Sequence, residues 1–307
     1  MININFSVVV PVFNKSACIE RMLASIFSQN HMPAEIIIVD DGSTDDSIQR
    51  VRDYKHVFQG IIKIISQPNS GVSVARNRGI SESSHAYVAL LDADDEWLPR
   101  HLEDICTLIK RYPNSIAYTC SHTLKDKAND LEVLKGVVGS ESFVLIENFF
   151  EIASKHNILN SSTVVLNTNR LKKEKIFPEG VKVGEDLFAW FSIMGNGSIG
   201  LCNSCGVIIH QEKDVQRDKR KTLPSYLIKY IYLNKKKLNQ FEYKYLWRVW
   251  VAHYYGSIIN VQIKLSIKYL KYGIGIFGFK ALFHIPMLII PSRVLIFCKN
   301  LYRQSRT

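Results

Sequence analysis

Short apolar runs rich in β-branched residues alternate with amphipathic segments along the first third of the chain, and this pattern constrains the fold most. The runs are six or seven residues long and lie at 6–12, 35–40, 61–66 and 86–91. Such runs are typical of buried parallel strands. Segments with apolar residues at helical spacing lie between them, at 16–28, 44–54 and 73–83. The alternation predicts an α/β domain with a mainly parallel sheet flanked by helices.

Further elements are expected downstream, with less regular spacing. Helices are predicted at 98–112, where Pro99 suits the first turn, and at 185–194. Strands are predicted at 116–121, 162–166 and 206–210. The stretch 122–160 shows no clear helical or strand periodicity. A polar, charged run at 211–221 marks a boundary, so we predict an α/β domain over 1–215 and a helical region over 216–307.

Polar side chains follow three of the predicted strands. Asn14 comes after the first strand, Asp40 and Asp41 end the second, and an acidic run at 92–95 follows the fourth. In open α/β sheets ligands bind beyond the carboxyl ends of the strands. Three acids within four residues repel one another unless a cation shares them. An Asp-x-Asp pair suits Mn²⁺ or Mg²⁺, which complete their shell with water and phosphate oxygens. Asp45 has a simpler interpretation as a helix cap.

The order and spacing of four segments closely resemble glycosyltransferase family 2. These segments are VVVPVFN, EIIIVDDGSTDDS, NSGVSVARNRGI and LLDADDEWLP. Gly184-Glu185-Asp186 is similar to the Glu-Asp motif of that family. The similarity covers 4–110 well and 160–210 more loosely. It implies a GT-A fold, a nucleotide diphosphate sugar donor, a divalent metal and inversion at the anomeric carbon.

The resemblance also implies residues for the nucleotide. Pro11, Val12 and Asn14 are expected to line the nucleotide pocket, and Asp41 to accept a hydrogen bond from the base. Arg76 either contacts the donor or forms a structural salt bridge. Uridine is the base most expected from the family, and a hexose or N-acetylhexosamine is the expected sugar.

The same resemblance implies metal and catalytic residues. Asp92 is expected near the ribose and the metal, and Asp94 to coordinate the metal beside the diphosphate. Asp186 matches the general base, since an acceptor hydroxyl needs a carboxylate to take its proton; its simpler interpretation is a first-turn acid stabilised by the helix dipole. Glu185 is a further candidate. His210 could complete the metal shell, touch the diphosphate, or be a satisfied strand-end histidine.

Two kinds of residue have mainly structural interpretations. Trp97 and Trp190 could stack on a sugar ring, but aromatic residues with apolar neighbours usually belong to a core. The six cysteines form no regular framework, and the Cys202-to-Cys205 pair lacks a second pair at zinc spacing. A reduced cytosolic setting is therefore expected. The first residues lack a positively charged signal-peptide region, which supports that expectation.

Charge is distributed unevenly along the chain. From Lys219 onward there are 17 Lys and Arg residues and one acid, Glu242, whereas residues 1–218 hold 22 basic and 27 acidic residues. Lysines and aromatic residues share the segments 227–238 and 261–272, which are predicted to be helices. Helices of this kind lie among lipid headgroups. The apolar stretch 273–298 is interrupted by charges and prolines, so monotopic or re-entrant attachment is favoured over a spanning helix.

Together these features predict a transferase at the cytoplasmic face of an anionic membrane, acting on a lipid-linked or oligosaccharide acceptor in surface polysaccharide synthesis. Transfer of a sugar directly to a polyprenyl phosphate is one alternative. A GT-A scaffold that binds nucleotide without turnover is another, as is a helical tail that packs with its lysines in solvent. Nucleic-acid binding is not expected, because no nucleic-acid module is recognisable and acids line the body.

Overall fold

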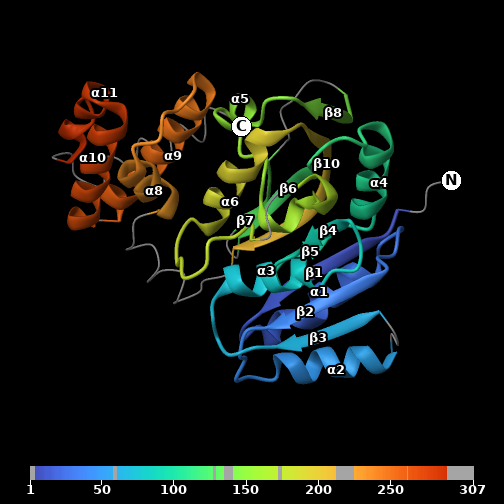
Figure 1. The fold of residues 1–307 in the computed structure, drawn as a ribbon. Helices are drawn as coiled ribbons and strands as arrows, with labels where there is room; N and C mark the ends of the chain where they lie inside the picture. Colours follow the sequence, from blue (N-terminus) through green and yellow to red (C-terminus); the bar gives the residue numbers. More distant parts are fainter. Residues whose placement is uncertain are drawn as a thin grey trace. The chain divides into compact units, whose positions relative to one another are not determined.

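Two compact units make up the chain in the computed structural model (Figure 1), which describes residues 4–57, 61–126, 129–134, 141–171, 175–211, 225–260 and 262–288. The first unit comprises Met1–Val181 and Asp186–Glu212. The second comprises Lys182–Glu185 and Lys213–Thr307. The boundary predicted at residue 215 lies outside the described residues.

One sheet organises the first unit, and its order within the described residues is β3-β2-β1-β4-β9-β6-β10-β5, with β7 paired to β6 and β8 to β10. The first five strands are β1 Phe6–Val12, β2 Glu35–Asp40, β3 Ile62–Ser66, β4 Tyr87–Leu90 and β5 Glu96–Trp97. The others are β6 Ala117–Asp126, β7 Asn129–Leu134, β8 Phe143–Ile146, β9 Val165–Asn167 and β10 Ile199–Gln211. The four strands predicted in the first third of the chain are confirmed.

Strand direction changes half-way across the sheet. The strands β3, β2, β1 and β4 are parallel to their neighbours, but β9 runs antiparallel between β4 and β6. The strands β5, β7 and β8 also pair antiparallel. The predicted mainly parallel sheet is therefore wrong for its second half, which is mixed. The connection between β6 and β7 is only two residues long, and so short a link permits only antiparallel pairing.

The helices of the first unit lie near the positions that the apolar spacing predicts, except the short helix at 149–153, which falls in a stretch where the sequence predicts no element. They are α1 Ser16–Phe27, α2 Ser47–Val57, α3 Val72–Ser81, α4 His101–Arg111, α5 Phe149–Ala153 and α6 Glu185–Ile193. The 3₁₀ turns are η1 Ser161–Thr163, η2 Thr168–Arg170 and η3 Met194–Asn196. Pro99 precedes α4 instead of lying in its first turn. The predicted strand at 162–166 begins with η1, so β9 starts three residues later than expected.

The core of the first unit lies where α1 and α4 cover apolar strand side chains. Buried residues of β1 and β2 belong to one cluster with buried residues of both helices. On α3, Gly79 lets the helix approach the sheet closely, because a Cβ placed there would lie 2.2 Å from Val9 Cγ1. Close packing of this kind fixes the depth at which α3 sits on β1.

The second unit is helical. Its elements are α8 Tyr226–Asn234, α9 Gln240–Ile259, α10 Ile263–Phe277, α11 Phe279–Leu282 and the 3₁₀ turn η4 Ile285–Leu288. Trp250 on α9 stacks on Tyr254 and donates a hydrogen bond of 2.7 Å to the Tyr269 carbonyl on α10. Among the helices of the described residues, none combines the length and apolar character that crossing a membrane requires.

Gly79→Ala tests the close packing of α3. The added methyl group has no room beside Val9, so we expect a loss of unfolding free energy of about 1–3 kcal/mol. Gly256→Ala on α9 is the matched control, because no atom lies within 4 Å of a Cβ there. Alanine at that helical position should instead stabilise by about 0.5–1 kcal/mol. Chemical denaturation measures both, and an unchanged stability for Gly79→Ala would contradict this packing.

Candidate functional site

Loops that follow β1 and β2 are tied together by Asn14. Parallel pairing sets Val12 opposite Asp40, so both strands end at the same edge of the sheet. The Asn14 N–H donates to Ser43 Oγ (3.2 Å), and Asn14 Oδ1 accepts from the Thr44 N–H (2.8 Å). Asn14 has a φ of 51°, a left-handed conformation that asparagine tolerates better than most residues. Asn14 thus shapes the predicted nucleotide pocket, and its amide lies at the surface of the loop.

The Asp41 carboxylate organises the loop after β3. Its Oδ1 accepts hydrogen bonds from Gln67 Nε2 and the Ser70 N–H, and its Oδ2 accepts one from the Gly71 N–H, each at 2.8 Å. A carboxylate offers about four lone-pair positions. Three of them are used here, so Oδ2 keeps capacity for one more donor. That capacity is compatible with the predicted hydrogen bond from a nucleotide base.

Pro11 and Val12 differ in their access to solvent. Pro11 is partly exposed near the end of β1, where it can border a ligand. The Val12 side chain is fully buried in the core, and its carbonyl accepts a hydrogen bond from the Asp41 N–H. In this conformation Val12 holds Asp41 in place and does not line a surface with its side chain.

Asp45, which follows β2, accepts hydrogen bonds from the first residues of two helices. Its Oδ2 accepts from the Ser16 N–H at the start of α1 (3.1 Å), and its Oδ1 from the Ser47 N–H at the start of α2 (3.0 Å). Burial raises the pKa of this carboxyl, but the hydrogen bonds outweigh that effect and the net shift is downward. Asp45 therefore caps two helices, as the simpler interpretation held.

Two acids in the loop after β4 have a cationic partner. Asp94 forms an ion pair with Lys15 Nζ at 2.7 Å, and both side chains are partly exposed. Asp92 forms an ion pair with Arg76 Nη2 at 2.7 Å, with the arginine almost fully buried. Arg76 is thus placed as a structural partner of Asp92. Sequence reasoning missed Lys15, although it directly follows Asn14 at the end of β1.

Asp95 is the buried member of this acidic loop. Its Oδ2 accepts from Ser162 Oγ (2.5 Å), and its Oδ1 accepts from the His210 N–H at the end of β10 (3.0 Å). Burial, together with the charges of Asp92 and Asp94, raises the pKa of Asp95 to about 8. A carboxyl with this pKa is mostly protonated at neutral pH, so the negative charge of the loop resides on the partly exposed Asp92 and Asp94.

The ring N–H groups of His210 and Trp97 both have hydrogen-bond partners within the protein. His210 Nε2 lies 3.1 Å from Glu96 Oε1, and the imidazole is buried. Trp97 is buried and donates through Nε1 to the Ser162 carbonyl at 2.8 Å. The structure thus places His210 as a strand-end histidine that anchors the acidic loop, and Trp97 as a core residue.

Two neighbouring residues of α3 fix the segment 175–179. The guanidinium of Arg76 lies 5.1 Å from the centre of the Phe177 ring. Asn77 is buried, accepts from the Phe177 N–H (2.9 Å) and donates to the Phe177 carbonyl (2.8 Å). Phe177 in turn meets buried Trp190 edge-on at 5.6 Å, so Trp190 belongs to the core. Arg76 therefore connects the acids after β4 with this segment.

Asp186 lies at the start of α6 and is brought close to the acids after β4. Its Oδ1 accepts from the Leu187 N–H at 2.7 Å. Loss of water around the carboxyl raises its pKa, the Leu187 hydrogen bond and the Arg76 charge lower it, and Asp92 raises it, with a net upward shift. A raised pKa makes a carboxylate a stronger proton acceptor. Glu185, the neighbouring candidate, belongs to the other compact unit.

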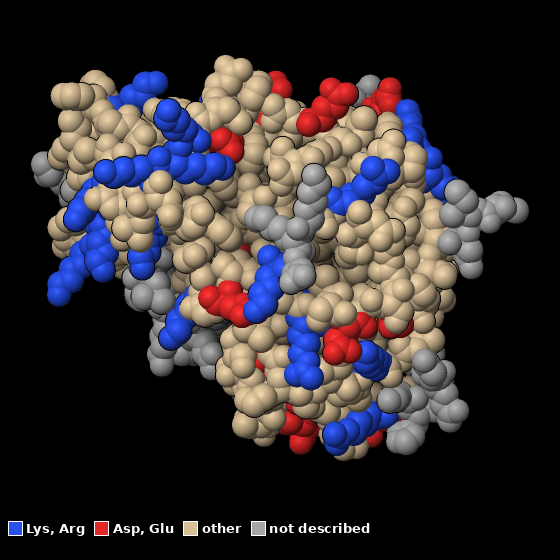
Figure 2. All heavy atoms as spheres, in the orientation of Figure 1, with Lys and Arg blue, Asp and Glu red and all other residues tan. Residues whose placement is uncertain are grey.

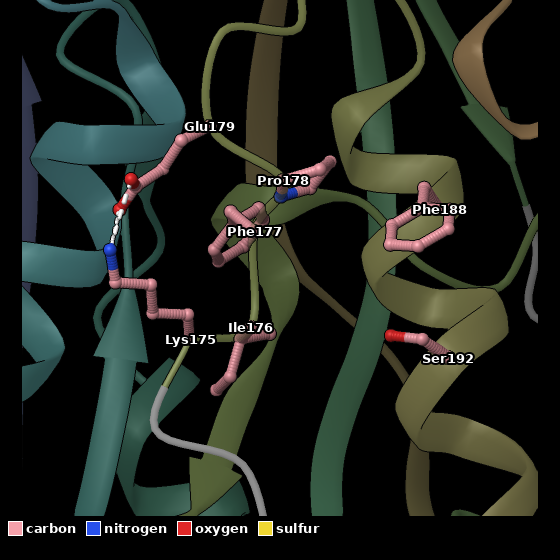
Figure 3. A pocket seen from close by; sticks show the side chains of 7 residues that line it. All are labelled: Lys175, Ile176, Phe177, Pro178, Glu179, Phe188 and Ser192. Carbon is pink, nitrogen blue, oxygen red and sulfur yellow. Dashed lines mark hydrogen bonds and ion pairs between the residues drawn. The ribbon is translucent and has the colours of Figure 1, made fainter.

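A hollow of about 210 Å³ lies between the segment 175–179 and α6. Figure 3 shows Phe177 and Phe188 facing each other across it, with Lys175 and Glu179 at one side. These two charged groups form an ion pair at 3.0 Å. Mainly apolar walls and a charged pair at the edge suit the apolar face of a ring whose rim carries hydroxyl groups.

Two partly exposed carboxylates are the candidate metal ligands among the described residues. Within them, no three His, Cys, Asp or Glu side chains converge to form a complete metal site. Asp92 and Asp94 are nevertheless partly exposed, and each already attracts a cationic side chain. One or two carboxylates are what Mg²⁺ and Mn²⁺ require when phosphate oxygens and water supply the other ligands. The residues therefore fit a metal that arrives with its nucleotide.

The sequence matches the model of one protein family. The family model for glycosyl transferase family 2 matches residues 7–177, more than half of the sequence. The chain belongs to glycosyl transferase family 2. The matched residues contain the parallel strands and the loops that carry Asn14, Asp41, Asp92 and Asp94, so the predicted membership is confirmed.

Curated relatives in the same family share part of their length with this chain. An uncharacterized glycosyltransferase of Rickettsia conorii is 31% identical over 195 residues, which are 63% of this chain and 31% of the relative. A putative teichuronic acid biosynthesis glycosyltransferase, TuaG of Bacillus subtilis, is 28% identical over 62% of this chain and 72% of its own. The alignment thus spans about a third of the Rickettsia protein.

Solved structures confirm the GT-A fold. TarS of S. aureus in complex with UDP-GlcNAc has a TM-score of 0.67 at 22% identity, over 89% of this chain and 82% of the other. A mannosyltransferase of Pyrobaculum calidifontis, in complex with GDP-Man and Mn²⁺, has a TM-score of 0.57 at 18% identity, over 92% of this chain and 79% of the other. At these identities the likeness is one of fold.

The pKa of Asp95 predicts how stability depends on pH in metal-free protein. The folded state keeps the proton up to about pH 8, whereas the unfolded chain releases it near the ordinary value of 3.8. Since the folded state binds more protons between these values, stability should fall as pH rises from about 4 to about 8. Asp95→Asn, which resembles the protonated acid, should flatten that dependence.

Denaturation at several pH values in the presence of a chelator measures this effect. Asp53→Asn is the matched control, because Asp53 is exposed on α2 and accepts a hydrogen bond from the Gln49 side chain. The control should keep the pH profile of the wild type. A slope that is the same in Asp95→Asn and in the wild type would contradict the assignment.

Proposed function

We propose that the chain is an inverting glycosyltransferase that moves a sugar from a nucleotide diphosphate sugar to a hydroxyl group of an acceptor. The observation that carries this proposal is the position of Asp186. Its carboxyl has Arg76 and Asp92 as charged neighbours. A proton acceptor beside the acids that follow a parallel strand is what sugar transfer from a nucleotide requires.

The donor is proposed to bind across the ends of β1, β2 and β4. Asp41 keeps one acceptor position for a base N–H, and Asn14 borders the same loops. UDP is the proposed nucleotide. The S. aureus protein of the same fold was solved with UDP-GlcNAc, which supports a uridine nucleotide, and the Pyrobaculum protein was solved with GDP-Man. The base is therefore the least constrained part of the donor.

Mn²⁺ or Mg²⁺ is proposed to bind at Asp94, with Asp92 as a second carboxylate. When bound, the cation offsets the negative charge that the departing nucleoside diphosphate gathers. Lys15 pairs with Asp94 in this structure and Arg76 pairs with Asp92. Both side chains therefore hold the carboxylates close to the position that the diphosphate is proposed to occupy.

Asp186 is proposed to take the proton from the acceptor hydroxyl as that oxygen attacks the anomeric carbon. The bond from carbon to the diphosphate oxygen breaks as the new bond forms, so one displacement inverts the configuration. The raised pKa of Asp186 brings its proton affinity closer to that of a working general base. The charge of Arg76 opposes this rise.

Acceptor binding is proposed to involve the hollow beside α6. Phe177 and Phe188 offer apolar surfaces, and Lys175 and Glu179 offer polar groups at its edge. The helix α6 that contributes Phe188 also carries Asp186 in its first turn. We propose a glycan or lipid-linked glycan as the acceptor, in surface polysaccharide synthesis. The relation to TuaG, whose name refers to teichuronic acid biosynthesis, supports this setting.

Replacing each acid of the Glu-Asp motif in turn shows which of the two carboxylates takes the proton. Asp186→Asn should lower the rate of sugar transfer about 10²–10⁴-fold, because the amide cannot take a proton, while donor binding changes little. Glu185→Gln is the matched variant and should keep the rate within tenfold. Single-turnover transfer to a glycan acceptor and calorimetric binding of the donor measure the two properties. A rate lost in Glu185→Gln and kept in Asp186→Asn would reverse the assignment.

A further inference from the structure

Large apolar side chains are exposed on the last described helices of the second unit. Ile263, Ile267 and Ile274 on α10 are 64%, 55% and 38% exposed, and Phe279 on α11 and Phe283 just after it are 84% and 83% exposed. We call these five residues the α10–α11 apolar set. In the described part of the first unit, the comparable residues are Met32 at 45% and Leu145 at 37%. Exposed apolar groups in such number mark an interaction surface.

The spacing of this set places its members on shared sides of their helices. Ile263, Ile267 and Ile274 are separated by four and seven residues, so they lie along one side of α10. Phe279 and Phe283 are also four residues apart. Two aromatic rings that are more than four-fifths exposed bury little surface against the rest of the chain, so they contribute little to its stability.

Lysines accompany the apolar set, and acids do not. Lys264, Lys268 and Lys271 are exposed on α10 next to the isoleucines, and exposed Lys280 follows Phe279. No Asp or Glu occurs between 243 and 288. Figure 2 shows Lys and Arg side chains gathered on the part of the surface that the helices α8–α10 form. The apolar side chains therefore lie in a positive field.

The buried side of α10 packs against α9. A Cβ at Gly273 would lie 2.4 Å from ring atoms of Trp250, so the two helices are in close contact there. Ser266 Oγ lies 2.8 Å from Ser257 Oγ, and both are buried. Because these contacts fix the rotation of α10 about its axis, the side with the three isoleucines stays exposed.

We infer that the α10–α11 apolar set is a docking surface for an anionic lipid membrane, with isoleucine and phenylalanine side chains in the headgroup region and the neighbouring lysines against lipid phosphates. Charge complementarity selects this occupant. Lysine is depleted at protein–protein interfaces, whereas helices that lie on membranes combine an apolar side with lysines. The inference is independent of the proposed sugar transfer and would hold for a protein without turnover.

Co-sedimentation of the full chain with vesicles tests this surface. Vesicles of phosphatidylcholine mixed with phosphatidylglycerol should bind the wild type, and vesicles of phosphatidylcholine alone should bind it much more weakly. Phe279→Ser/Phe283→Ser should weaken binding to the anionic vesicles about tenfold or more. The matched control is Met32→Ser/Leu145→Ser, which removes two exposed apolar side chains from the first unit and should bind as the wild type does.

A second pair of variants tests the charges. Lys264→Gln/Lys268→Gln should weaken binding by roughly fivefold for each lysine, and added salt should have a similar effect. Lys110→Gln/Lys155→Gln removes the same charge from exposed positions of the first unit and should leave binding unchanged. All these positions are exposed, so thermal unfolding should be the same in every variant.

Three results would overturn the inference. The first is a wild-type protein that does not sediment with anionic vesicles. The second is a Phe279→Ser/Phe283→Ser variant that binds them as tightly as its control. The third is a wild-type chain that is a dimer in gel filtration and becomes a monomer in this variant without any vesicle binding. The apolar set would then be an interface between two copies of the chain.

Discussion

Parallel pairing of β1 with β2 and β4 is the constraint on which the site depends. The pairing aligns Val12 with Asp40 and Val9 with Leu90, so the loops that follow the three strands leave the sheet at one edge. The acids in these loops therefore lie close together. Specific hydrogen bonds and ion pairs offset the repulsion between them. Lys15 pairs with Asp94, Arg76 pairs with Asp92, and Ser162 donates to Asp95. The carboxylates of Asp92 and Asp94 remain partly exposed and are suited to a cation that also binds phosphate oxygens.

Arg76 extends this constraint to the other side of the site. It is almost fully buried, so its charge is compensated within the protein, by Asp92 at 2.7 Å and by the face of Phe177. Its charge also lowers the pKa of Asp186, which burial raises. One side chain of α3 thus contacts the acids after β4, influences the proposed base and supports one wall of the hollow beside α6. A change at Arg76 would therefore affect the proposed donor, base and acceptor regions together.

Much of the first unit could be predicted from the sequence, because buried parallel strands are continuous apolar runs that identify themselves locally. The strand ends, and with them Asn14, Asp41, Asp92 and Asp94, follow directly. The second half of the sheet could not be predicted in the same way: β9 has three residues, and the direction of β8 depends on β10, which lies far along the sequence. The helix α9 lies in the region predicted to be helical, but its bounds could not be assigned because aromatic and apolar residues occur on all its sides, so no helical period stands out. Ser162 and Asn77 hold the site through hydrogen bonds to distant segments, which no local pattern reveals.

Calorimetric titration of the full chain with UDP, GDP and CDP, each with and without Mn²⁺, tests the central claim most directly. The claim is that the acids after β4 bind a metal together with a nucleotide diphosphate. It predicts that one nucleotide binds, that binding needs Mn²⁺, and that Asp94→Asn weakens it at least about tenfold, whereas the control Asp53→Asn does not. Binding of equal strength without Mn²⁺, unaffected by Asp94→Asn, would contradict the claim.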